Sequence, residues 1–466
     1  MNQHIKRLKG AKDLVFDAVE ETTNLVERMH VLVAKKSVRP LTLVEPLATL
    51  TQAVKTVHDS TASGIYEMIR IINRGIKKLL DAGTGLVTNG LTYPDDLRPD
   101  DLRPGNLQPD NLQSDNLLQG SMDASTNALD NSGEAFGRAQ MIDLSEAILN
   151  GLYGDYLCKK ENALDLGMRF RHQGKILPMD KDSLKQTFPD ATAKVCIFVH
   201  GLMCTEWLWQ IAAEKFYGDP SVTFGSQLKA DLSYTPLFVR YNTGRHISEN
   251  GRRFSDLLSQ LIDSYPVDIE EIVLIGHSMG GLVSRSAAYY GDAGNVPWIR
   301  RLRHVFCVGS PHLGAPLEKA ANMLGSLLRA FNTAGTQAPA QILNARSAGI
   351  KDLRFGYTVD DEWSDKDPDA FLSDNRLNLP LVDGVGYYFI AATITADPDH
   401  PMGLLIGDIM VRVPSAAGHT ADPDRRIPFR SGLIFNGMDH LHMANHPDVY
   451  KEIRNFIEAP QQSLTP

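Results

Sequence analysis

The chain has 466 residues, of which 43% are hydrophobic and 22% charged, and its formal net charge is −9. This composition is that of an ordinary globular protein, and the negative charge argues against nucleic acid as a partner. No apolar run reaches the roughly 18 residues of a membrane span, and the N-terminus lacks the pattern of a signal peptide, so we expect a cytoplasmic protein.

Four cysteines occur, and their spacing matches neither a zinc site nor a redox motif. Cys196 and Cys307 lie in apolar runs of strand-like composition. We therefore expect buried, reduced thiols. Histidine and aspartate residues cluster in places, but no compact set of metal ligands appears, and the sequence indicates neither a metal nor a cofactor.

Residues 1–85 form a helical N-terminal region by their pattern, because apolar residues recur three and four apart within 11–80. Pro40 and Pro46 divide the pattern into two helices. The region is net positive, whereas the fifty residues that follow are net negative. Such a helix pair packs on the rest of the chain or on itself, or alternatively binds a membrane surface or a partner protein.

Residues 86–135 contain a five-residue repeat in which Asp or Asn precedes Leu, with prolines at 94, 99, 104 and 109. Five short copies are too few to bury a solenoid core, and proline disfavours regular strands. We therefore expect a flexible acidic linker, followed by a catalytic domain over 136–466.

From about residue 136, apolar strands alternate with longer helical stretches, which is typical of a parallel sheet covered by helices on both faces. Residues 317–380 interrupt this alternation. Their first half has helical apolar spacing and predicts either a lid or an ordinary core helix, and residues 360–369 read as a solvated acidic surface. The five expected strands are 195–199, 237–241, 272–275, 304–308 and 387–392.

Ser278 stands between two glycines at the end of an apolar strand, in the sequence Gly276-His-Ser-Met-Gly280. A strand that turns sharply into a helix holds such a serine in a strained conformation with its hydroxyl exposed. Glycine on each side avoids a collision across the turn. We therefore predict that Ser278 is a nucleophile.

An activated serine needs donors for the oxyanion, a base and a group that orients the base. The strand 195–199 runs into His200-Gly201-Leu202, so we expect the backbone N–H groups of Leu202 and Met279 to form an oxyanion hole. His200 itself is expected to support this loop rather than to act as a base.

Asp408 follows the apolar residues 404–406 and is the preferred orienting acid. Aspartates at 383, 397 and 399 are the alternatives, which fit loops or turns better. His440 is the preferred base, because it lies in the loop before the final predicted helix, 447–457. His442 remains an alternative base, while His446 fits a cap or a surface position.

These motifs occur in the order found in the lipase/esterase branch of the α/β-hydrolases, which residues 190–458 resemble. Within that branch the chain is similar to the glycosylphosphatidylinositol inositol-deacylase-like group and to bacterial lipases with a His-Gly-Leu loop. The resemblance implies an α/β-hydrolase fold, a triad of Ser278, Asp408 and His440, and an acyl-side loop at 310–316. It covers neither the first 150 residues nor a membrane anchor.

We therefore expect a serine hydrolase that cleaves carboxylic esters, of lipid or another class, through an acyl-enzyme. A thioesterase, an amidase, and a non-catalytic scaffold that binds a membrane or a partner through its N-terminal helices remain alternatives. Residues expected to contact the substrate are His200, Gly201, Tyr241, His277 and His312.

Overall fold

The computed structural model describes residues 140, 142–144, 146–315, 346–367, 374–397, 407–408 and 410–459. The regions predicted at 1–85 and 86–135, and the predicted lid helix after residue 317, lie outside these residues. The fold is that of the unit that begins at Glu146. In this part of the chain no helix is both long enough and apolar enough to cross a bilayer.

The strands of the described residues form one eight-stranded sheet in the order β2-β1-β4-β3-β5-β6-β7-β8. β1 pairs antiparallel with β2 and β4, and every other pair is parallel. The strands are β1 Met168–His172, β2 Lys175–Ile176, β3 Lys194–Val199, β4 Thr235–Tyr241, β5 Glu271–His277, β6 Leu302–Val308, β7 Gly386–Thr393 and β8 Ser431–Asn436.

All five predicted strands are confirmed, as β3, β4, β5, β6 and β7. The short strands β1, β2 and β8 were not expected from the sequence. They lie at or next to the two edges of the sheet, and most of their residues are partly or fully exposed, so they lack the continuous apolar run of a buried parallel strand.

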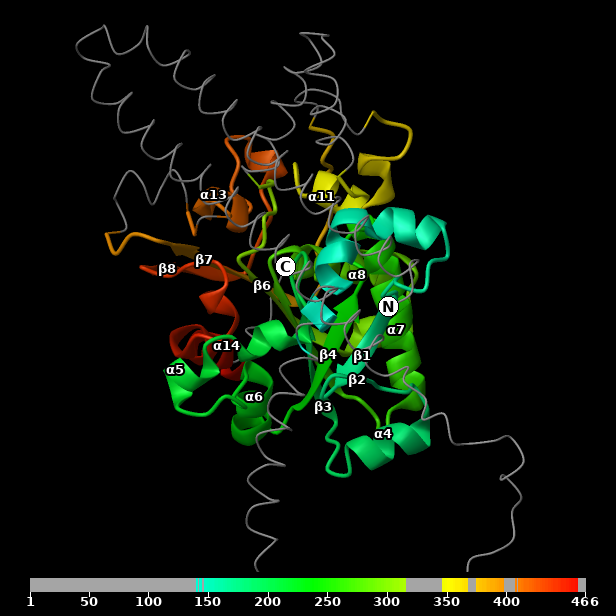
Figure 1. The fold of residues 1–466 in the computed structure, drawn as a ribbon. Helices are drawn as coiled ribbons and strands as arrows, with labels where there is room; N and C mark the ends of the chain where they lie inside the picture. The colour runs from blue at the N-terminus through cyan, green and yellow to red at the C-terminus, as the bar shows by residue number, and fades with distance from the viewer. Residues whose placement is uncertain are drawn as a thin grey trace, which may run out of the picture. The chain divides into compact units, whose positions relative to one another are not determined.

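Helices cover both faces of the sheet, as predicted (Figure 1). Alternate residues of each strand point to opposite faces, so Ile197 packs with α7 (Ile247–Ser264) and α8 (Met279–Ala293). Phe198 instead packs with α6 (Phe224–Leu232) and α14 (Pro447–Glu458), and α14 confirms the final predicted helix. The remaining helical segments are 146–159, α4 Lys181–Thr187, η3 Glu206–Gln210, α5 Ala213–Tyr217, η4 Pro297–Arg301, α11 Ala348–Asp352, η5 Asp360–Glu362, α13 Val413–Ala416, η6 Pro423–Arg425 and η7 His442–Ala444.

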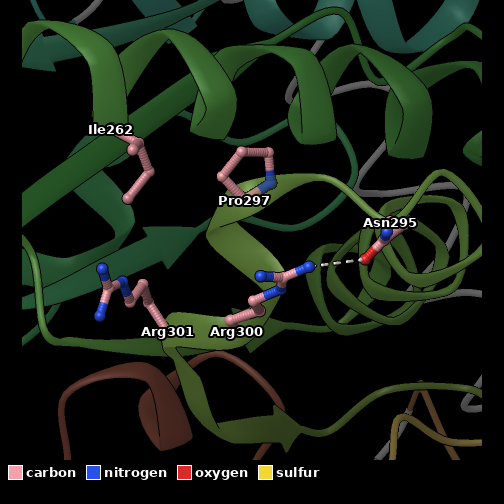
Figure 2. Close-up of a pocket in the computed structure, with 5 residues that line it drawn as sticks. All are labelled: Ile262, Asn295, Pro297, Arg300 and Arg301. Carbon is pink, nitrogen blue, oxygen red and sulfur yellow. Dashed lines mark hydrogen bonds between the residues drawn. The ribbon is translucent and has the colours of Figure 1, made fainter.

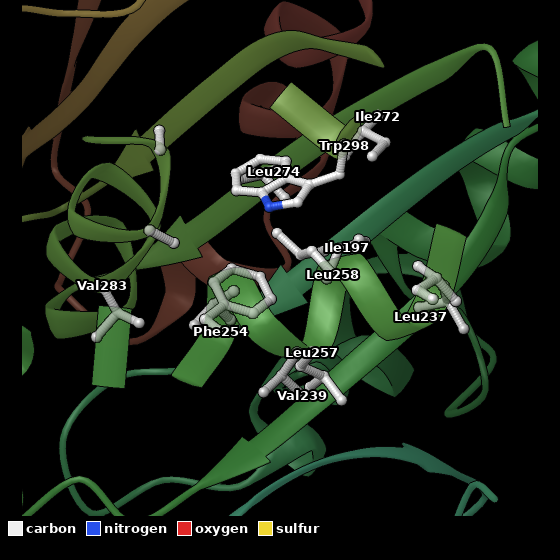
Figure 3. Packing of buried hydrophobic residues seen from close by; sticks show 14 of the residues in the cluster. Ile197, Leu237, Val239, Phe254, Leu257, Leu258, Ile272, Leu274, Val283 and Trp298 are labelled. Carbon is white, nitrogen blue, oxygen red and sulfur yellow. The ribbon is translucent and has the colours of Figure 1, made fainter. Parts of the chain in front are cut away.

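The larger core lies between the sheet and the α7–α8 pair. Figure 3 shows Trp298 of η4, Leu274 of β5, Phe254 of α7 and Val283 of α8 in one buried cluster. The indole N–H of Trp298 donates to the Ser255 hydroxyl at 3.1 Å, which satisfies the one polar atom of this buried side chain. This core holds α8, and therefore the residue at its start, rigidly on the sheet.

The cysteines are free thiols, as expected, and Cys196 and Cys307 are buried. Burial raises the pKa of the Cys307 thiol to about 12, so this group is an inert, uncharged part of the core.

Of the predicted insertion, the structure describes residues 346–367 and 374–380, and the first of these segments is anchored to α7 and α8. Asp352 is buried and bonds to His246 Nδ1 at 3.0 Å and to the backbone N–H of Ile247 at 2.8 Å. The ring of Trp363 stacks on His246 at 3.5 Å between centroids. Burial opposes a charge on His246, but the hydrogen bond and charge of Asp352 outweigh it and raise the pKa of this histidine.

The expectation of a solvated acidic surface at 360–369 is wrong at Glu362, which is fully buried. Its carboxylate accepts the backbone N–H groups of Thr358, Val359 and Leu377, the last two at 3.0 and 2.8 Å. Three backbone donors offset the loss of hydration that burial of a carboxylate entails.

A packing test follows from the contact between α7 and α8. A Cβ on Gly251 would lie 2.0 Å from the Ser286 hydroxyl, and that hydroxyl already donates to the carbonyl of Thr358 at 2.6 Å. We predict that Gly251→Ala lowers the free energy of unfolding by about 1–3 kcal/mol, measured by urea denaturation. Gln260→Ala, at an exposed site of the same helix, is the control and should change stability by less than about 0.5 kcal/mol.

The sign of the change in the free energy of unfolding tests whether the two helices are in close contact at Gly251. At an unhindered helix position, Gly→Ala stabilises by about 1 kcal/mol. A rise in stability for Gly251→Ala would therefore contradict the close helix contact.

Candidate active site

Ser278 stands at the junction of β5 and α8. Its backbone has φ 54° and ψ −123°, and a positive φ is uncommon for a residue that carries a side chain. Its N–H donates to the carbonyl of Val308 at the end of β6, at 2.8 Å. The neighbouring strand therefore holds the strained turn from strand to helix.

The two glycines that flank Ser278 allow backbone segments to meet without side chains between them. A Cβ on Gly276 would lie 2.4 Å from the nitrogen of Gly281, and one on Gly280 would lie 2.1 Å from the carbonyl oxygen of Val199. Both distances are far below any real contact of a Cβ. The start of α8 consequently packs directly on the end of β3, where the loop of residues 200–204 begins.

Two backbone donors beside Ser278 have no acceptor among the described residues, and they belong to Leu202 and Met279. Met279 is the first residue of α8, where helical N–H groups have no partner within the helix. Leu202 lies in a turn that the Cys204 N–H closes on the carbonyl of Gly201 at 3.3 Å. A Cβ on Gly201 would be 3.0 Å from the Ser278 Cβ, so this turn adjoins the serine.

The residues predicted as acid and base are hydrogen-bonded to each other. His440 Nδ1 and Asp408 Oδ2 are 2.8 Å apart, and both side chains are buried. The other carboxylate oxygen of Asp408 accepts the backbone N–H groups of Met410 and Val411 at 3.0 and 2.7 Å. The two backbone donors therefore fix the orientation of the carboxylate, and its Oδ2 faces the imidazole.

The imidazole of His440 and the backbone of Ser278 both lie against the end of β6. A Cβ on Gly309 would lie 3.1 Å from His440 Cε1, while the Ser278 N–H binds the carbonyl of the preceding residue, Val308. The Ser278 hydroxyl makes no hydrogen bond within the described residues. Such contacts in unliganded enzymes are often loose and tighten when the substrate binds.

Gly309 was not identified from the sequence, although its lack of a side chain lets the imidazole of His440 lie against the end of β6. Its φ of 62° suits glycine, and any side chain there would meet both His440 and Met443. The only sequence signal is a glycine directly after the strand that neighbours the elbow.

Two further histidines of the predicted site are buried and neutral. Burial lowers the pKa of His200 and of His277 to about 3. His277 Nε2 donates to the carbonyl of His440 at 2.8 Å, and the positive charge of a protonated His440 also opposes a charge on His277. His277 thus supports the loop that carries the imidazole.

His200 bonds within the loop of residues 200–204, where the sequence led us to expect a supporting role. Its Nδ1 bonds to the carbonyl of Gly201 at 2.9 Å, and the ring stacks on Tyr241 at 4.6 Å between centroids. The Tyr241 hydroxyl donates to the carbonyl of His200 at 2.9 Å. The predicted contacts of His200, His277 and Tyr241 with substrate stay predictions.

His312 is also buried, and its Nδ1 accepts from Arg285 Nη1 at 3.0 Å. Burial, together with the charges of Arg285 and Arg376, holds the pKa of His312 well below its usual range. The Leu313 N–H donates to the Ser415 hydroxyl at 3.1 Å, which links the loop 310–316 to the segment after Asp408. A substrate contact of His312 likewise stays a prediction.

The two other histidines of this segment, His442 and His446, have different partners. His442 pairs with Asp439, and both side chains are more than one third exposed. His446 caps α14 and accepts the N–H of Asp448 at 3.2 Å. Neither histidine is bonded to a buried carboxylate, which supports the preference for His440.

A cavity of about 440 Å³ lies at the end of the sheet where the parallel strands begin. Figure 2 shows Ile262 of α7 together with Pro297, Arg300 and Arg301 of η4, and Asn295 accepts from Arg300 at 3.4 Å. Arg301 directly precedes β6, whereas Ser278 follows the parallel strand β5. This cavity is therefore separated from the serine by the length of a strand. In the described residues no group of three or more His, Cys, Asp or Glu side chains is arranged to hold a metal ion.

The buried bond between His440 and Asp408 predicts a proton NMR signal. An imidazole N–H that donates to a buried carboxylate is strongly deshielded and exchanges slowly with water. We expect a far-downfield resonance in the wild type that is lost in Asp408→Ala and retained in His442→Gln. Its loss in His442→Gln and persistence in Asp408→Ala would contradict this arrangement.

Comparisons with known proteins give one match to a family model and a set of structural neighbours. Residues 190–377 match the model of the PGAP1-like alpha/beta domain. A mature lipase from Bacillus licheniformis is 15% identical, with 57% of this chain and 91% of that chain covered and a TM-score of 0.35. A naproxen esterase from Bacillus subtilis is 13% identical, with 58% and 84% covered and a TM-score of 0.30. No curated protein matches the chain.

The family match and the observed sheet together confirm the fold that the sequence predicted. Residues 190–377 include the loop after β3, the elbow after β5 and the loop after β6. The chain has an α/β-hydrolase fold, and residues 190–377 resemble the PGAP1-like alpha/beta domain.

Proposed function

We propose that the chain is a serine hydrolase that cleaves carboxylic esters through an acyl-enzyme. The observation that carries the proposal is the convergence of three features at the end of the sheet where its parallel strands finish. They are the strained Ser278, the buried hydrogen bond between His440 and Asp408, and the N–H groups of Leu202 and Met279, which have no acceptor among the described residues. An esterase-like or lipase-like fold supports ester hydrolysis in general.

In the first half of the reaction, the Ser278 hydroxyl adds to the ester carbonyl while His440 Nε2 accepts its proton. The carbonyl oxygen becomes an oxyanion, which the N–H groups of Leu202 and Met279 stabilise. His440 then protonates the leaving alkoxide, the carbon–oxygen bond breaks, and an acyl-Ser278 ester remains.

In the second half, water adds to the acyl-enzyme and His440 takes its proton. The tetrahedral intermediate expels the Ser278 oxygen, which regains the proton, and the carboxylic acid leaves. Asp408 keeps His440 in the tautomer whose Nε2 accepts a proton and stabilises the imidazolium that forms. Because burial keeps His200 and His277 neutral, the imidazolium forms without a second positive charge beside it.

The first test compares four proteins on p-nitrophenyl esters of two to twelve acyl carbons. Ser278→Ala and His440→Ala should each lower kcat by about 10⁴ or more, because the nucleophile and its base act as one unit. His442→Ala is the matched control, since it removes a nearby histidine, and it should keep kcat within about twofold. A loss of turnover in His442→Ala alone would assign the base to His442.

Thioesters and anilides with the same acyl groups separate the related activities. Preference for a thioester or an anilide over the ester would replace esterase by thioesterase or amidase on the same residues. Absence of turnover on every substrate would favour a non-catalytic scaffold.

A further inference from the structure

The turn that carries Leu202 has a backbone conformation that its own sequence does not favour. Gly201 and Cys204 close it by a 3.3 Å hydrogen bond, and Met203 at its third position has a φ of 58°. Leu202 is not among the residues with positive φ, so the middle peptide has the orientation of a type II turn. Glycine or asparagine normally occupies the third position, because a side chain is strained there.

One side chain from the segment after β4 holds the middle peptide of this turn, between Leu202 and Met203. The Met203 N–H donates to the hydroxyl of Thr243 at 3.2 Å, across forty residues of sequence. Thr243 is buried, so water has no access to replace its hydroxyl. Without this acceptor, the peptide between Leu202 and Met203 would favour the flipped orientation, which is less strained. The flip would alter the backbone of both residues.

Thr243 itself is fixed from two directions. The segment 242–244 follows β4 and lies against the helix at 146–159, since a Cβ on Gly244 would be 2.1 Å from the carbonyl oxygen of Asn150. On another side, the Gly349 N–H of α11 donates to the carbonyl of Gly244 at 3.0 Å. The hydroxyl that holds the turn is therefore attached to rigid elements.

The side chain of Met203 is held by the same helix. A Cβ on Gly151 would lie 2.3 Å from Met203 Cγ, so the methionine reaches its position only because residue 151 is glycine. Gly151 in turn accepts a 2.6 Å hydrogen bond from Ser347 at its carbonyl. Backbone and side chain of Met203 are thus both fixed by parts of the chain outside the turn.

We propose that Thr243 is a positioning residue for the oxyanion hole: it holds the Met203 amide, and through it directs the adjacent Leu202 N–H at the oxyanion formed on Ser278. This inference rests on the proposed function and extends it. Thr243 touches no reacting atom in this account. Its effect belongs to the transition state, because only there does the oxygen carry the charge that the Leu202 N–H stabilises.

The decisive comparison is between Thr243→Val and Thr243→Ser on p-nitrophenyl butyrate. The valine variant has nearly the same shape but no acceptor, and it should lower kcat by about tenfold to a hundredfold with KM within about twofold. The serine variant keeps the hydroxyl and should restore kcat to within about threefold. Inhibition by an alkyl trifluoromethyl ketone, which binds as a tetrahedral oxyanion on serine, should weaken by the same factor as kcat/KM.

A matched control comes from the start of β4, the strand that ends just before Thr243. Thr235 is buried, and its hydroxyl accepts the N–H of Thr192 at 3.1 Å, so Thr235→Val removes the same kind of bond far from Ser278. It should leave kcat and ketone affinity unchanged even if the melting temperature falls. Equal losses in Thr235→Val and Thr243→Val would overturn the positioning role.

A second set of variants decides the matter if Thr243→Val does not fold. Gly151→Ala should push Met203 away and lower kcat selectively, and Gly151→Ala combined with Met203→Ala, which removes the clashing Cγ, should recover most of the loss. Unchanged kcat in Gly151→Ala, or in a folded Thr243→Val, overturns the inference while the hydrolase proposal stands. A wild type without turnover on any ester, thioester or anilide overturns both.

Discussion

The arrangement of the site depends on the absence of side chains where three backbone segments meet at Ser278. Gly276 and Gly280 have no room for a Cβ, because the start of α8 lies directly on the end of β3. This contact brings the Gly201–Cys204 turn next to the serine, and the first N–H of α8 has no acceptor in the part of the chain that the structure describes. The strain at Ser278 is maintained by its bond to Val308 and by the large core that fixes α8 on the sheet.

The electrostatics of the site follow from burial. His200 and His277 hold the two loops on either side of Ser278, and desolvation keeps both rings neutral. His440 differs from them because a buried carboxylate, itself held by two backbone N–H groups, bonds to its Nδ1. Among the described residues, His440 is thus the histidine near Ser278 that is bonded to a buried carboxylate.

The sequence predicted the core of the fold and the candidate triad because these features have local signatures. Buried parallel strands are apolar runs, and an elbow needs glycines at fixed spacing. Asp408 was preferred because it follows an apolar run and His440 because it lies in the loop before the final helix, and the two side chains bond to each other in the structure. The buried Glu362 was placed wrongly on the surface, because its backbone donors include Leu377 from a later segment.

Thr243 had no local signature and Gly309 only a weak one, since their contacts with Met203 and His440 join segments distant in sequence. The direct test of the central claim is the mass of the protein after treatment with a fluorophosphonate, followed by peptide mapping. The account predicts a single adduct on Ser278, absent from Ser278→Ala and formed far more slowly in His440→Ala. An adduct on another residue, or no adduct on a folded wild type, would contradict the account.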